Sequence, residues 1–172
     1  MQTDYSLDKH IHNFSVWTAA RAVQRNFTTT ANIKLAIEQS DIPSFARYND
    51  IRSSEEYDRL HCQWAEQLIN AFDNLKAPKC SYGRAAKIIS IYLKTSVLLC
   101  NRASCTASSI MHPPIDGILL RNIADIPGLS DLKSIRWTKL DKDKYWSLIK
   151  KLRSHFGQVD WKLENYWTPE LE

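Results

Sequence analysis

The sequence has few glycines and no strand pattern. Only four glycines occur among 172 residues, too few for a chain that turns repeatedly between short strands. No stretch alternates between apolar and polar residues over a useful length, and no internal repeat is visible. These absences predict an all-α protein. The length, with 44% apolar and 24% charged residues, suits one compact domain over residues 1–172.

The chain also lacks the apolar segments that membrane insertion and secretion require. The longest apolar candidate, residues 88–100, is interrupted by Lys94 and is shorter than the roughly 20 residues of a membrane helix. The N-terminus has neither a basic start nor an apolar run, so we predict no signal peptide. We therefore expect a cytoplasmic protein that has no membrane partner and keeps its four cysteines reduced.

The cysteines and histidines do not form a recognisable metal motif. Cys100, Cys105 and His112 could supply three zinc ligands, with His61 or Cys62 as a fourth. Their spacings are irregular, however, and no Cys-x-x-Cys pair occurs. We therefore predict neither a metal nor another cofactor, and we interpret His61 as a hydrogen-bonded, half-buried residue.

Helical periodicity and capping residues divide the chain into about seven predicted helices. The clearest one follows Ser53, which forms a capping-box pattern with Glu56 ahead of apolar residues at helical spacing. We expect the second and third long helices, over residues 54–75 and 81–99, to be central. The predicted helices cover residues 7–25, 30–39, 54–75, 81–99, 114–125, 141–157 and 160–167. The predicted loops include residues 44–52 and 101–112.

The predicted helix over residues 81–99 is apolar except for one polar stripe. Arg84, Lys87, Ser90 and Lys94 follow one another at intervals of three or four residues, so they share a face. The next helix carries Asp116 in its first turn, where exposed N–H groups favour a negative charge. A lysine in a partly dry cleft loses its proton more readily and becomes a nucleophile, which makes Lys87 and Asp116 candidate catalytic residues. Spacing alone favours another interpretation of the same two residues, a solvated lysine and a carboxylate that stabilises a helix start.

Three short segments carry a resemblance to a known enzyme family. Residues 83–89 read Gly-Arg-Ala-Ala-Lys-Ile-Ile, residues 114–124 read Pro-Ile-Asp-Gly-Ile-Leu-Leu-Arg-Asn-Ile-Ala, and residues 161–167 read Trp-Lys-Leu-Glu-Asn-Tyr-Trp. In this order they resemble three helices of the helix-hairpin-helix DNA glycosylases, in particular the 8-oxoguanine glycosylases: the hairpin helix with the catalytic lysine, the helix with the essential aspartate, and a late helix. In the commonest family pattern the lysine stands two residues after the glycine, where this chain has Ala85. Lys87 therefore requires a shifted hairpin.

The resemblance implies an enzyme of DNA repair, or of DNA-modification sensing, that turns a base out of the duplex into a pocket. Lys87 would attack the sugar carbon as the base leaves and form a Schiff base, while Asp116 would stabilise the developing positive charge. The groups expected to hold phosphate are Tyr82, Gly83, Arg84 and Lys94. The aromatic residues expected to line the base pocket are Trp17, Trp64, Trp161 and Trp167.

The overall charge permits DNA binding without identifying it. A net charge of +4 and a pI near 8.9 attract phosphate but fall short of the concentrated basic character of a dedicated nucleic-acid binder. A second interpretation therefore stays open: a non-catalytic helical module that binds nucleic acid or a protein partner. Such a module would use the stripe of Arg84, Lys87 and Lys94, or an exposed tryptophan patch.

Overall fold

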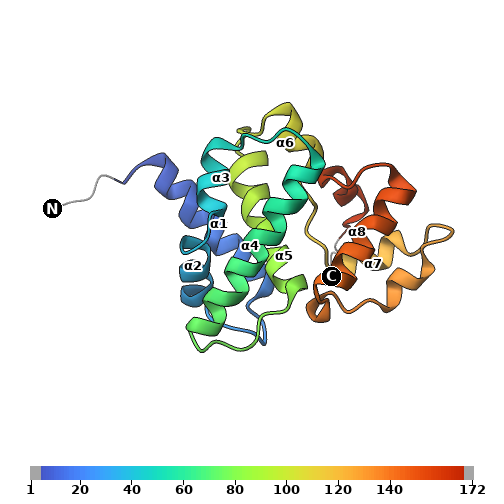
Figure 1. Ribbon diagram of the computed structural model, residues 1–172, viewed down its shortest axis with the longest axis horizontal. Helices are drawn as coiled ribbons and strands as arrows, with labels where there is room; N and C mark the ends of the chain where they lie inside the picture. The colour runs from blue at the N-terminus through green and yellow to red at the C-terminus, as the bar shows by residue number, and fades with distance from the viewer. Residues whose placement is uncertain (1–4, 169–172) are drawn as a thin grey trace.

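The computed structural model describes residues 5–168, which form an all-α protein without a strand in that range, as the composition predicts (Figure 1). The α-helices are α1 (Leu7–Val23), α2 (Thr30–Glu38), α3 (Ile42–Tyr48), α4 (Ser54–Asn74), α5 (Tyr82–Leu93), α6 (Cys105–Ile110), α7 (Gly117–Ile123) and α8 (Lys142–Phe156). The π-helix η1 (Lys94–Leu98) continues α5. The 3-10 helices are η2 (Ser130–Ser134), η3 (Trp137–Lys139) and η4 (Trp161–Tyr166). Between residues 5 and 168 no helix is long and apolar enough to cross a bilayer.

Side-chain caps set the starts of the long helices. The hydroxyl of Ser53 accepts a hydrogen bond from the backbone N–H of Glu56 at 3.2 Å, which places the start of α4 where the capping-box pattern predicts it. Ser81 caps α5 and Asp141 caps α8 in the same way. Gly157 ends α8 with φ of +76°, a conformation that glycine adopts without strain. These local signals explain why the boundaries of the long helices agree with the sequence patterns.

The helix α5 is the centre of the fold. Ten of its 12 residues are buried. The helices α1 and α4 pack along it, whereas η3 and α8 contact it from the C-terminal part of the chain. Figure 1 shows α1 to α4 gathered on one side of the molecule and α7 and α8 on the other. The helix α5 therefore lies where these two groups of helices meet.

Two segments that the sequence predicts as loops are short helices. Residues 42–48 form α3, and Pro43 lies in its first turn. Residues 105–110 form α6, which Ser104 caps. Helices of seven and six residues are too short to display an apolar period, so the prediction was wrong for both. The segment predicted as a last α-helix over residues 160–167 is the 3-10 helix η4.

Candidate functional site

Lys87 and Asp116 meet in the structure. The Nζ atom of Lys87 lies 3.1 Å from Oδ2 of Asp116, and only 9% and 12% of the two side chains are exposed. Lys87 comes from the second turn of α5, whereas Asp116 is the N-cap residue of α7 and not a residue of its first turn. Two helix starts, whose residues stand 29 positions apart in the sequence, thus supply one buried ion pair.

Four hydrogen-bond donors fix the Asp116 carboxylate. Its Oδ1 atom accepts from the backbone N–H groups of Ile118 and Leu119, each at 3.0 Å, which is the capping interaction that starts α7. Its Oδ2 atom accepts from Lys87 and, at 3.0 Å, from the indole N–H of Trp167. Charge-assisted hydrogen bonds of this kind are among the stronger ones in proteins. The carboxylate is therefore held in one orientation toward the lysine.

A second tryptophan covers the lysine. The Nζ atom of Lys87 lies 4.4 Å from the ring centroid of Trp137, within cation–π range. Trp137 reaches this position because η3 packs directly on the start of α5. A β-carbon at Gly83 would stand only 2.0 Å from the carbonyl oxygen of Trp137, and the N–H of Gly83 donates to the carbonyl of Leu140 at 3.0 Å. The absence of a side chain at Gly83 thus allows η3 to approach.

The rest of the polar stripe also faces the C-terminal part of the chain. Lys94 forms an ion pair with Glu164 of η4. Between the two lysines lies Ser90, whose buried hydroxyl has no hydrogen-bond partner among residues 5–168. The Oε1 atom of Glu164 is unpartnered as well in that range. Two lysine–carboxylate pairs therefore connect the continuous helix formed by α5 and η1 to α7 and η4. The polar stripe thus faces the C-terminal part of the chain and not the solvent.

The other residues expected to hold phosphate are also engaged within the chain. Tyr82 is buried, and its hydroxyl accepts from the indole N–H of Trp146 at 3.0 Å. The guanidinium carbon of Arg84 lies 4.6 Å from the ring centroid of Phe27. The N–H of Gly83 is used by the contact with η3. Phosphate binding by these groups stays a prediction, and it would require them to exchange their present partners.

The four tryptophans expected around a base are dispersed. Trp64 is buried in the core of the α1 to α5 bundle, and Trp17 is half exposed on α1. Trp161 lines a surface pocket of about 770 Å³ between η1 and η4. Trp167 is the member of this group that touches the ion pair, through Asp116.

The sequence reasoning missed the residues that surround the pair. Trp137, which covers the lysine, was not among the candidate residues, although it follows a Pro-Gly turn in a segment without a clear period. Its neighbours Arg136 and Lys139 are exposed and form no ion pair within residues 5–168. The same holds for Arg121, whose Nη1 atom lies 3.2 Å from the position of a β-carbon on Gly117. Exposed cations thus occur both on α7, which Asp116 caps, and on or next to η3, whose Trp137 covers Lys87.

A buried cluster of histidines and tyrosines lies between α4, α5 and α8. Nδ1 of His112 lies 3.1 Å from the hydroxyl of Tyr145, which lies 3.4 Å from Nε2 of His61. Nδ1 of His61 in turn lies 3.3 Å from the hydroxyl of Tyr82. Burial lowers the pKa of both histidines and raises the pKa of Tyr145. His61 is fully buried and hydrogen-bonded, so the prediction was right about its bonding and underestimated its burial.

An ion pair closes the outer end of this cluster. Nη2 of Arg153 lies 2.7 Å from Oδ1 of Asp58 and 3.2 Å from Nε2 of His112. Burial alone would raise the pKa of Asp58, but hydrogen bonds from Arg153 and His112 outweigh it and lower that pKa to about 2. We therefore interpret the cluster as a structural polar core, in which the buried groups have hydrogen-bond partners and which connects α8 to α4.

The candidate zinc ligands do not come together as a set. The rings of His61 and His112 lie with their centroids 5.3 Å apart and their planes tilted by 46°, but the thiol of Cys100 donates to the carbonyl of Thr95 at 3.2 Å on η1. The side chain of Cys105 lies outside the described part of the structure. Within the described part, no group of three or more histidine, cysteine or acidic side chains is placed to hold a metal ion.

No family model, curated protein or solved structure matches this chain. A functional assignment must therefore rest on the arrangement of its own residues. The enclosed pair of Lys87 and Asp116, with a tryptophan on each partner and exposed cations around it, is the strongest candidate site.

Proposed function

We propose that this protein binds DNA and acts on a damaged or modified base in the manner of a helix-hairpin-helix glycosylase, with Lys87 and Asp116 as its reacting pair. The observation that carries the proposal is the buried 3.1 Å contact between the two side chains. Asp116 is held by its capping bonds to α7, and Lys87 of α5 is covered by Trp137, so the two groups are positioned as a reacting pair requires. The resemblance of residues 83–89 and 114–124 to the family's lysine and aspartate helices supports the same assignment.

The surroundings of the pair suit a phosphate backbone. Arg121, Arg136 and Lys139 are exposed cations without ion-pair partners in the described range, and they lie on segments that border the pair. Contacts of such cations with phosphate position a duplex without reading its sequence, and they make affinity depend on salt. These three residues replace the inward-facing Arg84 and Lys94 as the proposed DNA contacts.

Trp167 is the proposed gate to the pair. Its indole N–H donates a hydrogen bond to Oδ2 of Asp116, and 39% of its surface is exposed. An extruded nucleotide would take the place of this ring beside the carboxylate. Aromatic rings at such sites stabilise a flipped base by stacking, so Trp137 and Trp167 would form the walls of the base site.

The chemical step follows from an amine beside a carboxylate. Lys87 first passes one proton to Asp116, and its neutral amine attacks C1′ of the deoxyribose. The bond from C1′ to the base breaks, its electron pair leaves on the base, and the base takes up that proton from Asp116. The lysine nitrogen then loses a further proton, and O4′ takes up a proton through water as the bond from C1′ to O4′ breaks. The nitrogen lone pair forms the C=N bond to C1′, which yields the iminium of a Schiff base.

Borohydride trapping tests the proposal. Borohydride delivers hydride to the iminium carbon and leaves a stable covalent adduct between the protein and DNA that contains an abasic site or a damaged base. We expect an adduct with the natural protein and none with Lys87→Arg, which keeps the cation opposite Asp116 but removes the nucleophile. Lys79→Arg, at an exposed lysine before α5, is the matched control and should trap normally. An equal adduct from Lys87→Arg, or no adduct and no base release from any substrate in a panel of damaged duplexes, would end the catalytic proposal.

A second candidate is a DNA-binding module in which the pair is structural. It is favoured by the enclosure of the pair: donors occupy both oxygens of Asp116, and Trp137 covers the lysine. Such a module would bind DNA with an affinity that falls steeply with salt and would leave every duplex intact. Arg136→Gln with Lys139→Gln should then lower the slope of log affinity against log salt by about two, since each phosphate contact contributes roughly 0.9.

A further inference from the structure

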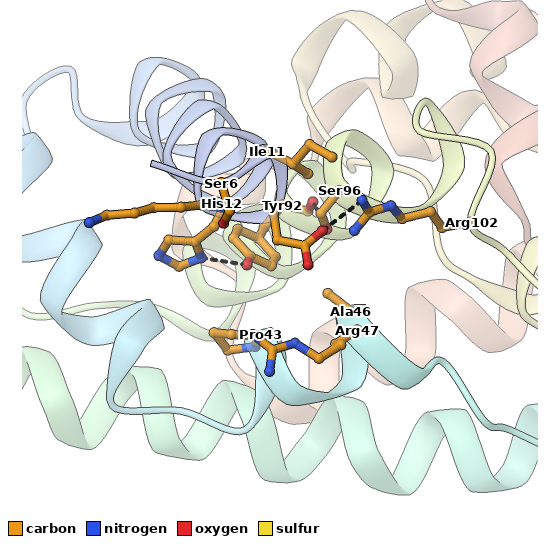
Figure 2. A pocket seen from close by; sticks show the side chains of 11 residues that line it. Ser6, Ile11, His12, Pro43, Ala46, Arg47, Tyr92, Ser96 and Arg102 are labelled. Carbon is orange, nitrogen blue, oxygen red and sulfur yellow. Dashed lines mark hydrogen bonds and ion pairs between the residues drawn. The ribbon is translucent and has the colours of Figure 1, made fainter. Parts of the chain in front are cut away.

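A cationic pocket lies away from the Lys87–Asp116 pair, between α1, α3 and the junction of α5 with η1 (Figure 2). Its volume is about 530 Å³, within the range of pockets that bind small molecules. Tyr92 of α5 lines it five residues after Lys87, which corresponds to a turn of about 140° around the helix. The pocket therefore uses a different face of α5 and is independent of the proposed DNA site.

Three cations from three segments are among the residues that line this pocket. Lys9 comes from the first turn of α1, Arg47 from the last turn of α3, and Arg102 from the segment after η1. Asp8 is the one carboxylate among the lining residues, and its Oδ1 atom lies 2.8 Å from Nη2 of Arg102. Lys9 and Arg47 form no ion pair with any residue between 5 and 168. The lining thus has a net formal charge of +2, with two of its cations unpaired.

Buried polar groups form the inner wall of the pocket. The hydroxyl of Tyr92 lies 2.8 Å from Nδ1 of His12, whose Nε2 atom lies 3.3 Å from Glu38 outside the pocket. Burial raises the pKa of Tyr92, so its hydroxyl stays protonated. The hydroxyl of Ser96 is buried next to it and donates to the backbone. In Figure 2 His12, Tyr92 and Arg102 lie along the same side of the hollow.

The third side of the pocket combines apolar contact with a free guanidinium. Pro43 and Ala46 line it from α3, and Ile11 lines it from α1. Figure 2 shows Arg47 beside Pro43, on the opposite side of the hollow from Tyr92. A ligand in this space would therefore meet cations at its charged end and apolar surface along the rest.

We propose that this pocket binds a phosphate monoester, with the phosphate between Arg47 and Arg102. A monoester carries about −1.5 to −2 charges near neutral pH and so matches the +2 of the lining, whereas a carboxylate or a backbone phosphodiester supplies one charge. Guanidinium groups present paired N–H donors that suit phosphate oxygens. Arg102 keeps further N–H groups for the ligand because only its Nη2 atom contacts Asp8. The sugar or other body of the ligand would lie against Pro43 and Ile11.

Binding of defined probes to the full chain tests the proposal. Ribose 5-phosphate is the small-molecule probe, with uncharged ribose as its control. Two single-stranded oligonucleotides of the same sequence, one with a 5′-phosphate and one with a 5′-hydroxyl, test whether the monoester belongs to a strand end. Titration calorimetry gives the affinities. Arg47→Gln and Arg102→Gln remove the proposed contacts, and Arg25→Gln, at an exposed arginine outside the pocket, is the matched control.

We expect ribose 5-phosphate to bind and ribose not to bind, and each pocket variant to weaken the affinity by roughly tenfold or more, as for the loss of a charge-assisted contact. Arg25→Gln should bind as the natural protein does. The 5′-phosphorylated oligonucleotide could bind more tightly than ribose 5-phosphate and lose affinity in both Arg47→Gln and Arg102→Gln. That result would assign the monoester to a strand end. Equal binding of the two oligonucleotides, with ribose 5-phosphate still bound, would assign the monoester to a small molecule. No binding of either phosphorylated probe, or equal losses in all three variants, would overturn the proposal. Arg47 is exposed and forms no ion pair between residues 5 and 168, so Arg47→Gln should leave the fold intact. A loss of binding in this variant therefore reports on the pocket and not on misfolding.

Discussion

Gly83 lies so close to Trp137 that a β-carbon on it would stand 2.0 Å from the carbonyl oxygen of Trp137. Gly83→Ala must therefore push η3 away from α5, although alanine is the better residue within a helix. We expect a loss of about 1–3 kcal/mol in the free energy of unfolding, typical of overpacking, measured by urea denaturation. The cation–π contact between Lys87 and Trp137 should weaken as well, because Trp137 belongs to the displaced segment.

The control for this change is Gly117→Ala at the start of α7. There a β-carbon would meet only Nη1 of Arg121, at 3.2 Å, and that atom is the end of a flexible side chain. The unfolding free energy should change by less than about 0.5 kcal/mol, as for surface substitutions. Equal effects of the two substitutions would show that Gly83 matters for a reason other than its contact with η3.

A double-mutant cycle can measure how much the ion pair of Lys87 and Asp116 contributes to the free energy of unfolding. Lys87→Met leaves the Asp116 carboxylate buried without its cation, which typically costs about 3–5 kcal/mol. Adding Asp116→Asn should recover part of that loss, because the asparagine can still cap α7 and carries no charge. Urea denaturation of the single and double variants measures the recovery. Lys144→Met, at an exposed pair with Asp141, is the control and should cost less than about 1 kcal/mol.

Much of the fold could be predicted from local sequence signals, because the long helices carry both an apolar period and a cap. The start of α4 at Ser53 is an example. The helices α3 and α6 were not predicted, because a helix of one or two turns is too short to show a periodic pattern of apolar residues. Pro43 lies in the first turn of α3, a position that suits proline as well as the residues after the end of a helix do.

The site could be predicted only in part. Periodicity placed Lys87 and Lys94 on one face of a helix, but it could not say which surface that face would meet. The structure shows that Asp116 and Glu164 meet it, from helices that pack on α5 through contacts distant in sequence. Trp137 could not be predicted at all from spacing, because its position depends on the close approach allowed by Gly83.

Removal of the buried hydroxyl of Tyr145 should lower the stability of the protein. It lies within hydrogen-bond distance of both His112 and His61, so Tyr145→Phe leaves ring nitrogens of two buried histidines without this partner. We expect a loss of about 1–3 kcal/mol in the unfolding free energy, the usual cost of a buried polar group without a bond. Tyr5→Phe removes an exposed hydroxyl that contacts His10 and should change stability by less than about 0.5 kcal/mol. Similar values for the two variants would mean that the buried network contributes little.

The ion pair of Asp58 and Arg153 should make the protein sensitive to acid. The pKa of Asp58 is about 2 in the folded chain against an ordinary value of 3.8, so its stabilisation is complete above pH 3.8 and is lost as pH falls toward 2. The lowered pKa of the buried His112 acts in the same direction at higher pH, because the unfolded chain takes up a proton below about 6.5 and the folded chain does so only at lower pH.

Urea denaturation at a series of pH values from 7 to 2 measures this loss. Asp58→Asn should remove about 1–2 kcal/mol of stability at pH 7, after allowance for the partial exposure of the pair, and should flatten the acid part of the profile. Asp143→Asn, at an exposed aspartate in the first turn of α8, should keep the natural profile. If Asp58→Asn kept the full loss between pH 4 and pH 2, the acid sensitivity would have to come from other carboxylates. The contact with Arg153 would then be too well solvated to stabilise the attachment of α8.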